Sequence, residues 1–138
     1  MDAADAIIFG APTYMGTASA AFHTFAQAST KRWYSQSWVD KLAAGFTNSG
    51  AKNGDKSSTL SYFATMAAQH GMHWVNLGLP PGHNNSKSTE DSLNRHGFFL
   101  GAAAQSNADE SADVVPPLAD LRTAEHLGAR VAEVAQQL

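Results

Sequence analysis

The sequence predicts an α/β fold built on a parallel, doubly wound sheet, and three observations favour this class. Short apolar runs over residues 6–9 and 42–47 are typical of strands that are buried on both faces of a sheet. Each run is followed by a loop rich in Gly, Ser, Thr or Asn, and then by a segment with helical spacing of its apolar residues. This alternation of strand and helix favours parallel strands joined by helical crossovers.

The elements follow from the apolar pattern in chain order. We expect strands over residues 6–9, 42–47 and 72–77, helices that begin at Thr17, after Asp55 and after Pro116–Pro117, and a short apolar piece over 98–100 that could return to the sheet edge. Asp55 is the expected N-cap of the second helix, which should end near Gly71. Residues 79–97 are polar and too long for a simple connection, which indicates a functional loop.

Length and composition favour one domain over residues 1–138 and exclude several functions. A hydrophobic content of 43% and a charged content of 15% are typical of a globular protein. The net charge of −3, without a Lys/Arg cluster, argues against nucleic acid as a partner, and no apolar stretch is long enough to span a membrane. The chain has no cysteine, which excludes disulfides and thiolate metal sites. Without a recognisable secretory segment, we expect a cytoplasmic protein.

Two loops are the candidate ligand site. Ligands of doubly wound sheets bind beyond the carboxyl ends of the strands, and the loops over residues 10–17 and 47–54 follow the first two strands. Their hydroxyl, amide and aromatic groups suit a flat heteroaromatic ligand. The alternatives are that Tyr14 only packs on the sheet edge and that Gly50 and Gly54 are plain turn residues.

Other chemistries have weaker support. His70 and His73 lie on either side of a predicted helix end, and no third ligand accompanies them, so a structural histidine is favoured over a zinc ligand. The sequence has neither a G-x-S-x-G elbow nor a Walker loop. We therefore predict no metal site and assign no catalytic residue, although His70 and Tyr14 are the nearest candidates for a catalytic acid.

Four segments give the sequence a family resemblance: "DAIIFGAPTYMG", "KLAAGFTNSG", "QHGM" and "GLPPG". In this order and spacing they resemble the flavodoxin-like NAD(P)H:quinone oxidoreductases, the FMN reductase family that includes the tryptophan-repressor-binding protein. The resemblance runs from about Asp5 to the final helix. It implies a flavodoxin-like fold, FMN as cofactor, hydride transfer from NAD(P)H to a quinone, and a homodimer or homotetramer.

The resemblance also assigns cofactor-binding positions in both loops, at the end of the second helix and in one aromatic residue. These positions are Pro12, Thr13, Tyr14, Met15 and Gly16, then Asn48, Ser49, Gly50, Ala51, Lys52 and Asn53, then Gln69 and His70, and finally Trp33.

Several of these positions depart from the family pattern. An Arg and a Phe are usual where Tyr14 and Met15 stand, and the second loop is one residue longer. The flavin-facing His of the family falls at Gln69. Trp33 stands where family members place a Trp that reaches across a subunit interface toward a neighbour's flavin; the alternative is a plain core or interface aromatic.

The largest departure concerns the start of the chain. "AIIFG" resembles strand 3 of the family, so that strand 1, the hydroxyl-rich phosphate loop, helix 1 and strand 2 have no counterpart in the sequence. Loss of three charge-assisted hydrogen bonds to phosphate would cost about 5 kcal/mol, so we expect weak or absent FMN binding by this chain alone. An alternative function is a truncated, flavin-free interaction module, or an incomplete gene product, whose apolar edge strand over residues 6–9 pairs with a second copy.

Overall fold

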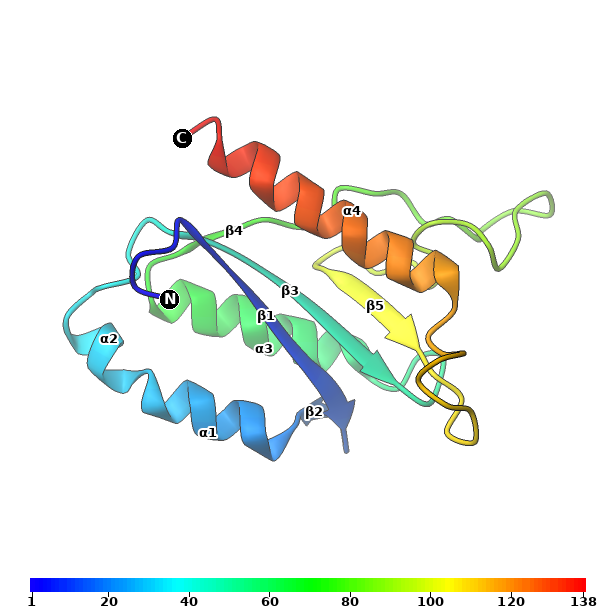
Figure 1. The fold of residues 1–138 in the computed structure, drawn as a ribbon, viewed down its shortest axis with the longest axis horizontal. Coiled ribbons are helices and arrows are strands. Elements are labelled where there is room, and N and C mark those ends of the chain that lie inside the picture. The colour runs from blue at the N-terminus through cyan, green and yellow to red at the C-terminus, as the bar shows by residue number, and fades with distance from the viewer.

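A computed structural model describes all 138 residues and confirms the α/β class. One sheet carries helices on both of its faces (Figure 1). The elements in chain order are β1 (Ala6–Tyr14), β2 (Thr17–Ala18), α1 (Ala20–Ala28), α2 (Thr30–Tyr34), β3 (Leu42–Ser49), α3 (Lys56–Gln69), β4 (His73–Trp74), β5 (Ala102–Gln105) and α4 (Leu118–Ala135). None of the helices is both long enough and apolar enough to cross a lipid bilayer.

The sheet is parallel except for the small strand β2. Its order is β2-β1-β3-β4, and β5 also pairs with β3. Along β1 and β3 the register places Ile7 beside Ala43 and Pro12 beside Asn48. Since β1, β3 and β5 run in the same direction, their carboxyl ends meet at one edge of the sheet (Figure 1).

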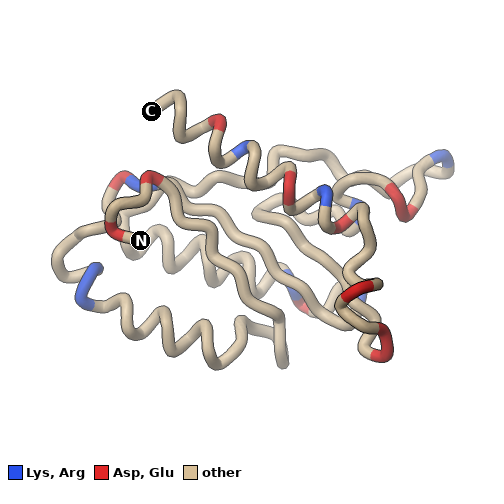
Figure 2. Tube along the Cα trace, viewed as in Figure 1, with Lys and Arg blue, Asp and Glu red and all other residues tan.

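Apolar side chains form a core layer on each face of the sheet. One layer lies between the sheet and helices α1 and α3, and includes Phe9, Phe22 and Phe63. The other lies between the sheet and α4, and includes Leu127 and Val131. Lys and Arg residues are spread over several segments and interspersed with Asp and Glu (Figure 2).

The first two strands extend further than their apolar runs predict. β1 continues through Pro12 and Thr13 to Tyr14, so most of the expected loop over residues 10–17 is strand. The alternating burial of Ile7, Phe9, Ala11 and Thr13 explains the extension, because a period of two marks one buried face. Pro12 is tolerated because β1 is an edge strand over most of its length.

The third expected strand is much shorter than predicted. Only His73 and Trp74 of residues 72–77 pair with β3, beside its first two residues. The rest of that side of β3 pairs with β5 over residues 102–105, and not with the apolar piece over 98–100. Three alanines in β5 carry little apolar signal, whereas 98–100 is the more apolar stretch, which explains the misplacement.

The edge of β1 is open, as the sequence predicts. β2 pairs only with Thr13 and Tyr14, which leaves the outer edge of residues 6–12 without a strand. The adjoining face is also partly uncovered, since Ile8 is 40% and Phe46 46% exposed. An unpaired apolar edge is a surface to which another strand can pair.

Candidate functional site

The carboxyl ends of β1 and β3 are joined by a cluster of three threonine hydroxyls. Thr13 Oγ1 lies 2.7 Å from Thr47 Oγ1 and 2.7 Å from Thr59 Oγ1, and all three residues are buried. Thr47 also donates to the carbonyl of Ala11 at 2.7 Å. The Thr13 hydroxyl, expected to face a ligand, is therefore engaged inside the protein, where it fixes the strand ends and the start of α3 relative to one another.

A tight turn follows β1 and leaves the ring of Tyr14 exposed at the carboxyl edge of the sheet. Met15 and Gly16 both have positive φ, 49° and 83°, and they connect β1 to β2. Tyr14 is 64% exposed and Met15 is fully exposed, so neither side chain is used in the core. The structure therefore leaves an aromatic ring free at the carboxyl end of β1, alongside the loop that follows β3.

The loop over residues 50–54 carries an unusual asymmetry of hydrogen bonding. None of its five backbone N–H groups donates a hydrogen bond within the chain. Four of its five carbonyls, by contrast, are engaged: Gly50 accepts from Gln105 Nε2 at 2.8 Å, Ala51 accepts from Ser49 Oγ at 3.0 Å, and residues 51–53 accept from Lys56. The loop therefore has free N–H donors for a ligand, whereas most of its carbonyl acceptors are already hydrogen-bonded within the protein.

Lys56 is the side chain that donates hydrogen bonds to the carbonyls of residues 51–53. Its ammonium donates to the carbonyls of Ala51 and Lys52 at 2.7 Å each, and to Asn53 at 3.4 Å, and the residue has no exposed surface. Burial lowers the pKa of Lys56 to about 8 from its ordinary value of 10.5. A buried cation at the first position of α3 therefore shapes the loop that precedes the helix.

The entry into α3 differs from the expected cap. Asp55 stands at the N-cap as predicted, but its backbone is left-handed, with φ of 55°, and its side chain makes no capping hydrogen bond. The Asn53 side chain instead accepts from the Asp55 N–H at 2.9 Å. At Gly54, with φ of 55°, a Cβ would lie 2.1 Å from Ser49 Oγ, so this glycine is required by the turn.

Two residues of this edge were missed by the sequence reasoning. Asn48 Nδ2 donates to Ser106 Oγ at 2.9 Å, and the Ser106 N–H donates to the carbonyl of Ser49 at 3.1 Å. Gln105 holds Gly50, as described above. The only signal in the sequence was a run of alanines before Gln105 and Ser106, which is too weakly apolar to mark a strand.

Lys52 ties the loop to the long polar segment over residues 79–97. Its ammonium donates to Glu90 at 2.8 Å, and Arg95 also donates to Glu90. These two hydrogen bonds, Lys52 first and then Arg95, lower the pKa of Glu90 to about 2. The carboxylate thus stays charged at neutral pH and connects the segment to the loop.

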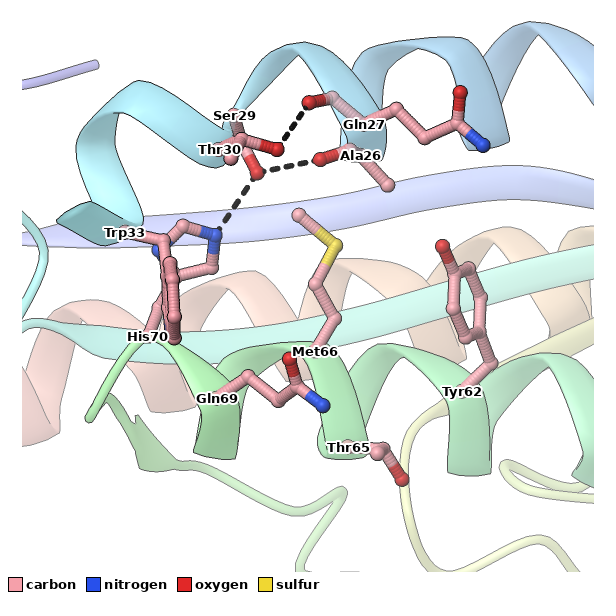
Figure 3. Close-up of a pocket in the computed structure, with 10 residues that line it drawn as sticks. All are labelled: Ala26, Gln27, Ser29, Thr30, Trp33, Tyr62, Thr65, Met66, Gln69 and His70. Atoms are coloured by element: carbon pink, nitrogen blue, oxygen red, sulfur yellow. Dashed lines mark hydrogen bonds between the residues drawn. The ribbon is translucent and has the colours of Figure 1, made fainter.

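The other three predicted site residues lie at the opposite end of α3. Trp33, Gln69 and His70 line a cavity of about 310 Å³ between α3 and helices α1 and α2 (Figure 3). Because α3 starts beside loop 50–54 and ends at Gln69, these residues are a full helix length away from that loop. Within one chain, the predicted site is therefore divided into two separate groups.

His70 is largely a structural histidine within this chain. Its Nε2 lies 2.9 Å from Ser29 Oγ, and its ring packs 4.4 Å from the ring of Trp38. Burial lowers its pKa, and its Nδ1 is buried without a hydrogen-bond partner. His73 is exposed beside Asp40, and no group of three His, Cys, Asp or Glu residues is arranged to hold a metal ion.

The comparisons with known proteins decide the family. The sequence profile of the NADPH-dependent FMN reductases matches residues 1–83. The chain belongs to this family. It is 45% identical over 138 residues to Flavodoxin FldP of Pseudomonas aeruginosa, covering all of this chain and 74% of that protein. It is 35% identical over 134 residues to an NAD(P)H dehydrogenase (quinone) of Archaeoglobus fulgidus, covering 97% of this chain and 61% of the relative.

A solved structure supports the fold as well as the family. The flavodoxin, WrbA-like protein from Agrobacterium tumefaciens is 46% identical and superposes with a TM-score of 0.73. The match covers 99% of this chain and 69% of that one. The flavodoxin-like fold that the resemblance implies is thus confirmed, and FMN and NAD(P)H, the expected cofactors, are those of the family. The chain spans about three fifths to three quarters of the length of these relatives.

The residues at the sheet edge fit the ring portion of FMN. The pyrimidine edge of an isoalloxazine presents mainly acceptors, and the N–H groups of residues 50–54 are donors without partners. The exposed ring of Tyr14 supplies an aromatic surface of the kind that a flat heteroaromatic group packs against. Loop 50–54 and the turn after Tyr14 are therefore the groups that would hold the ring.

Proposed function

We propose that this protein is an FMN-dependent oxidoreductase that uses NAD(P)H to reduce a quinone. The single observation that carries the proposal is the loop over residues 50–54, whose amides are free while its carbonyls are held by Lys56, Ser49 and Gln105. Both the family and the relative named as a quinone dehydrogenase support this assignment.

The residues of the chain have binding and positioning roles in this proposal. Amides of residues 50–54 donate to the acceptor edge of the ring, and Tyr14 packs beside it. The chemistry that FMN supplies when bound is two-electron hydride transfer. The protein fixes the ring in place, and no side chain at this edge has to act as an acid.

A second copy of the chain would complete the site. Trp33, Gln69 and His70 lie at the other end of α3, so they reach a flavin on loop 50–54 only if a neighbouring subunit provides them. We therefore expect a homodimer or homotetramer in which Trp33, 41% exposed, faces the flavin of its neighbour. The open edge of β1 is an additional surface for assembly.

The test is an FMN titration of the purified chain by fluorescence quenching, followed by NADPH oxidation with a benzoquinone as acceptor. We expect binding in the micromolar range and quinone-dependent oxidation of NADPH. Replacement of Trp33 with Ala should lower the affinity at protein concentrations where the chain is oligomeric, and should have little effect where it is monomeric. Absence of quenching at high micromolar FMN would contradict the proposal.

The second candidate is a flavin-free interaction module, and the open edge of β1 is the observation that favours it. Residues 6–12 have no strand on their outer side, and Ile8 and Phe46 leave apolar surface next to that edge. This candidate predicts stable self-association without any flavin. The two functions are distinguished by the same titration, because a module of this kind assembles and yet fails to quench FMN fluorescence.

A further inference from the structure

Asp120 lies at the centre of a buried network that ends on loop 50–54. It is in the first turn of α4, and only 1% of its side chain is exposed. Arg95 donates to its two oxygens at 2.7 Å and 2.9 Å, and the backbone N–H of Gln105 donates at 2.9 Å. His96 Nε2 lies 3.3 Å from the same carboxylate. The position of Asp120 in the sequence, within an amphipathic helix, gives no sign of this role.

Two routes lead from Asp120 to the loop. The first passes through Gln105, whose backbone is held by Asp120 and whose side chain donates to the carbonyl of Gly50 at 2.8 Å. The second passes through Arg95, which donates to Glu90; Glu90 in turn accepts from Lys52 at 2.8 Å. One route fixes the backbone at the start of the loop, and the other fixes a side chain two residues later.

Electrostatics favour a charged carboxylate at Asp120, the centre of the network. Burial by itself raises the pKa of Asp120, but the hydrogen bonds from Arg95, His96 and the backbone of Gln105 hold it well below its usual range. Only 6% of the Arg95 side chain is exposed. A buried ion pair contributes little net stability, since desolvation offsets its attraction, but it strongly favours one geometry when all its hydrogen bonds are made.

We propose that Asp120 is a positioning residue that holds loop 50–54 with its amides directed outward. The proposal rests on the proposed function for its biological meaning, because the loop is the one we assign to the flavin. The network pulls the Gly50 carbonyl and the Lys52 side chain toward the protein, while Lys56 gathers the carbonyls of Ala51 and Lys52 from the other side. The loop is then rigid although its amides make no hydrogen bonds.

The experiment measures the rigidity of the loop without any ligand. In the free wild-type chain, the ¹⁵N order parameters of residues 50–54 should be near 0.8, a value close to that of rigid backbone. The double variant Gln105→Ala/Glu90→Ala removes the acceptor of Lys52 and the donor to Gly50, and so both routes. It leaves the buried Asp120–Arg95 pair in place, so the fold should be retained. We expect its order parameters over 50–54 to fall below about 0.6, which is the flexible range.

Asp120→Asn is the second variant, and Leu127→Ala, which creates a cavity under the same helix, is the matched control for lost stability. Asp120→Asn should lower the order parameters of loop 50–54 and weaken FMN binding at least about fivefold. In the folded fraction of Leu127→Ala, the order parameters of the loop and the FMN affinity should equal those of wild type. Unchanged order parameters in the double variant would overturn the proposal. If wild type fails to bind FMN, the proposed function fails, and the order parameters still decide whether Asp120 fixes the loop.

Discussion

The ammonium of Lys56 donates to the carbonyl of Ala51 at 2.7 Å, although Lys56 is a helical residue without exposed surface. A lysine rarely accepts such burial unless its charge is used, because desolvation disfavours the charged form. Here the charge is used to turn three loop carbonyls inward. The neighbouring amides make no hydrogen bonds within the chain, and we infer that they are available to an acceptor-rich ligand.

Replacement of Lys56 with Met should separate stability from binding. Removing the buried charge ends its desolvation cost, and residues 51–53 are exposed, so their carbonyls can turn to water once the ammonium is gone. The free energy of unfolding at pH 7 should therefore change by less than about 1 kcal/mol. The FMN affinity should fall about fivefold to tenfold, because the loop loses its inward contacts. Urea denaturation and FMN titration measure the two effects. Lys31→Met, at an exposed position in α2, is the control and should change neither.

The buried Lys56 also predicts a pH dependence. Its pKa is about 8 in the folded state, below the ordinary 10.5, so the unfolded chain binds more protons between these values. The contribution of Lys56 to the free energy of unfolding should therefore rise with pH from about 8 to 10.5, by roughly 3 kcal/mol in all. The difference between wild type and Lys56→Met, measured by denaturation across this range, isolates it. A pH-independent difference would show that Lys56 titrates normally.

The threonine cluster predicts a cost for losing one hydroxyl. Thr47→Val removes the donor to Ala11 and a partner of Thr13 while keeping the shape of the side chain. The Ala11 carbonyl and the Thr13 hydroxyl each lose one buried hydrogen bond, while Thr13 keeps its contact with Thr59, so the free energy of unfolding should fall by about 1–3 kcal/mol. Denaturation of Thr47→Ser, which keeps the hydroxyl, should show a smaller loss. An equal or larger loss in Thr47→Ser would assign the effect to the methyl group.

The open edge of β1 predicts self-association. Wild type should be a dimer or larger by light scattering. The double variant Ile8→Lys/Phe46→Lys should shift it toward monomer, because it places two charges on the apolar face beside the open edge, where a second copy would be buried. Both side chains are about half exposed, so the fold should persist. Val114→Lys, at an exposed position before α4, should leave the association unchanged. A wild-type chain that is monomeric at high concentration would contradict this prediction.

The sequence predicted the fold class well because long-range order in this fold follows from local patterns. The continuous apolar run over residues 6–9 marks a buried strand, and the helical spacing of apolar residues after Asp55 marks a helix. The length of β4 and the position of β5 were predicted wrongly, because both strands pair with the same side of β3 and each limits the length over which the other can pair. Such competition between segments far apart in the chain leaves no local signal.

The candidate site was predicted only in part, for a similar reason. Residues 50–53 were found because a Gly- and Asn-containing loop after a strand is a local signal. Lys56, Gln105 and Asp120 were not found, because their roles arise from carbonyls and amides brought to them by the fold. The sequence likewise gave no means to see that Trp33 and loop 50–54 lie at opposite ends of α3.

The most direct test of the account is an FMN titration followed by both flavin fluorescence and the amide ¹H–¹⁵N resonances of the chain. The account predicts that the resonances of residues 50–54 shift together and saturate at the same micromolar FMN concentration as the quenching. Binding of FMN that leaves these five amides unperturbed, or no binding at high micromolar FMN, would contradict the claim that their free N–H groups form the flavin site.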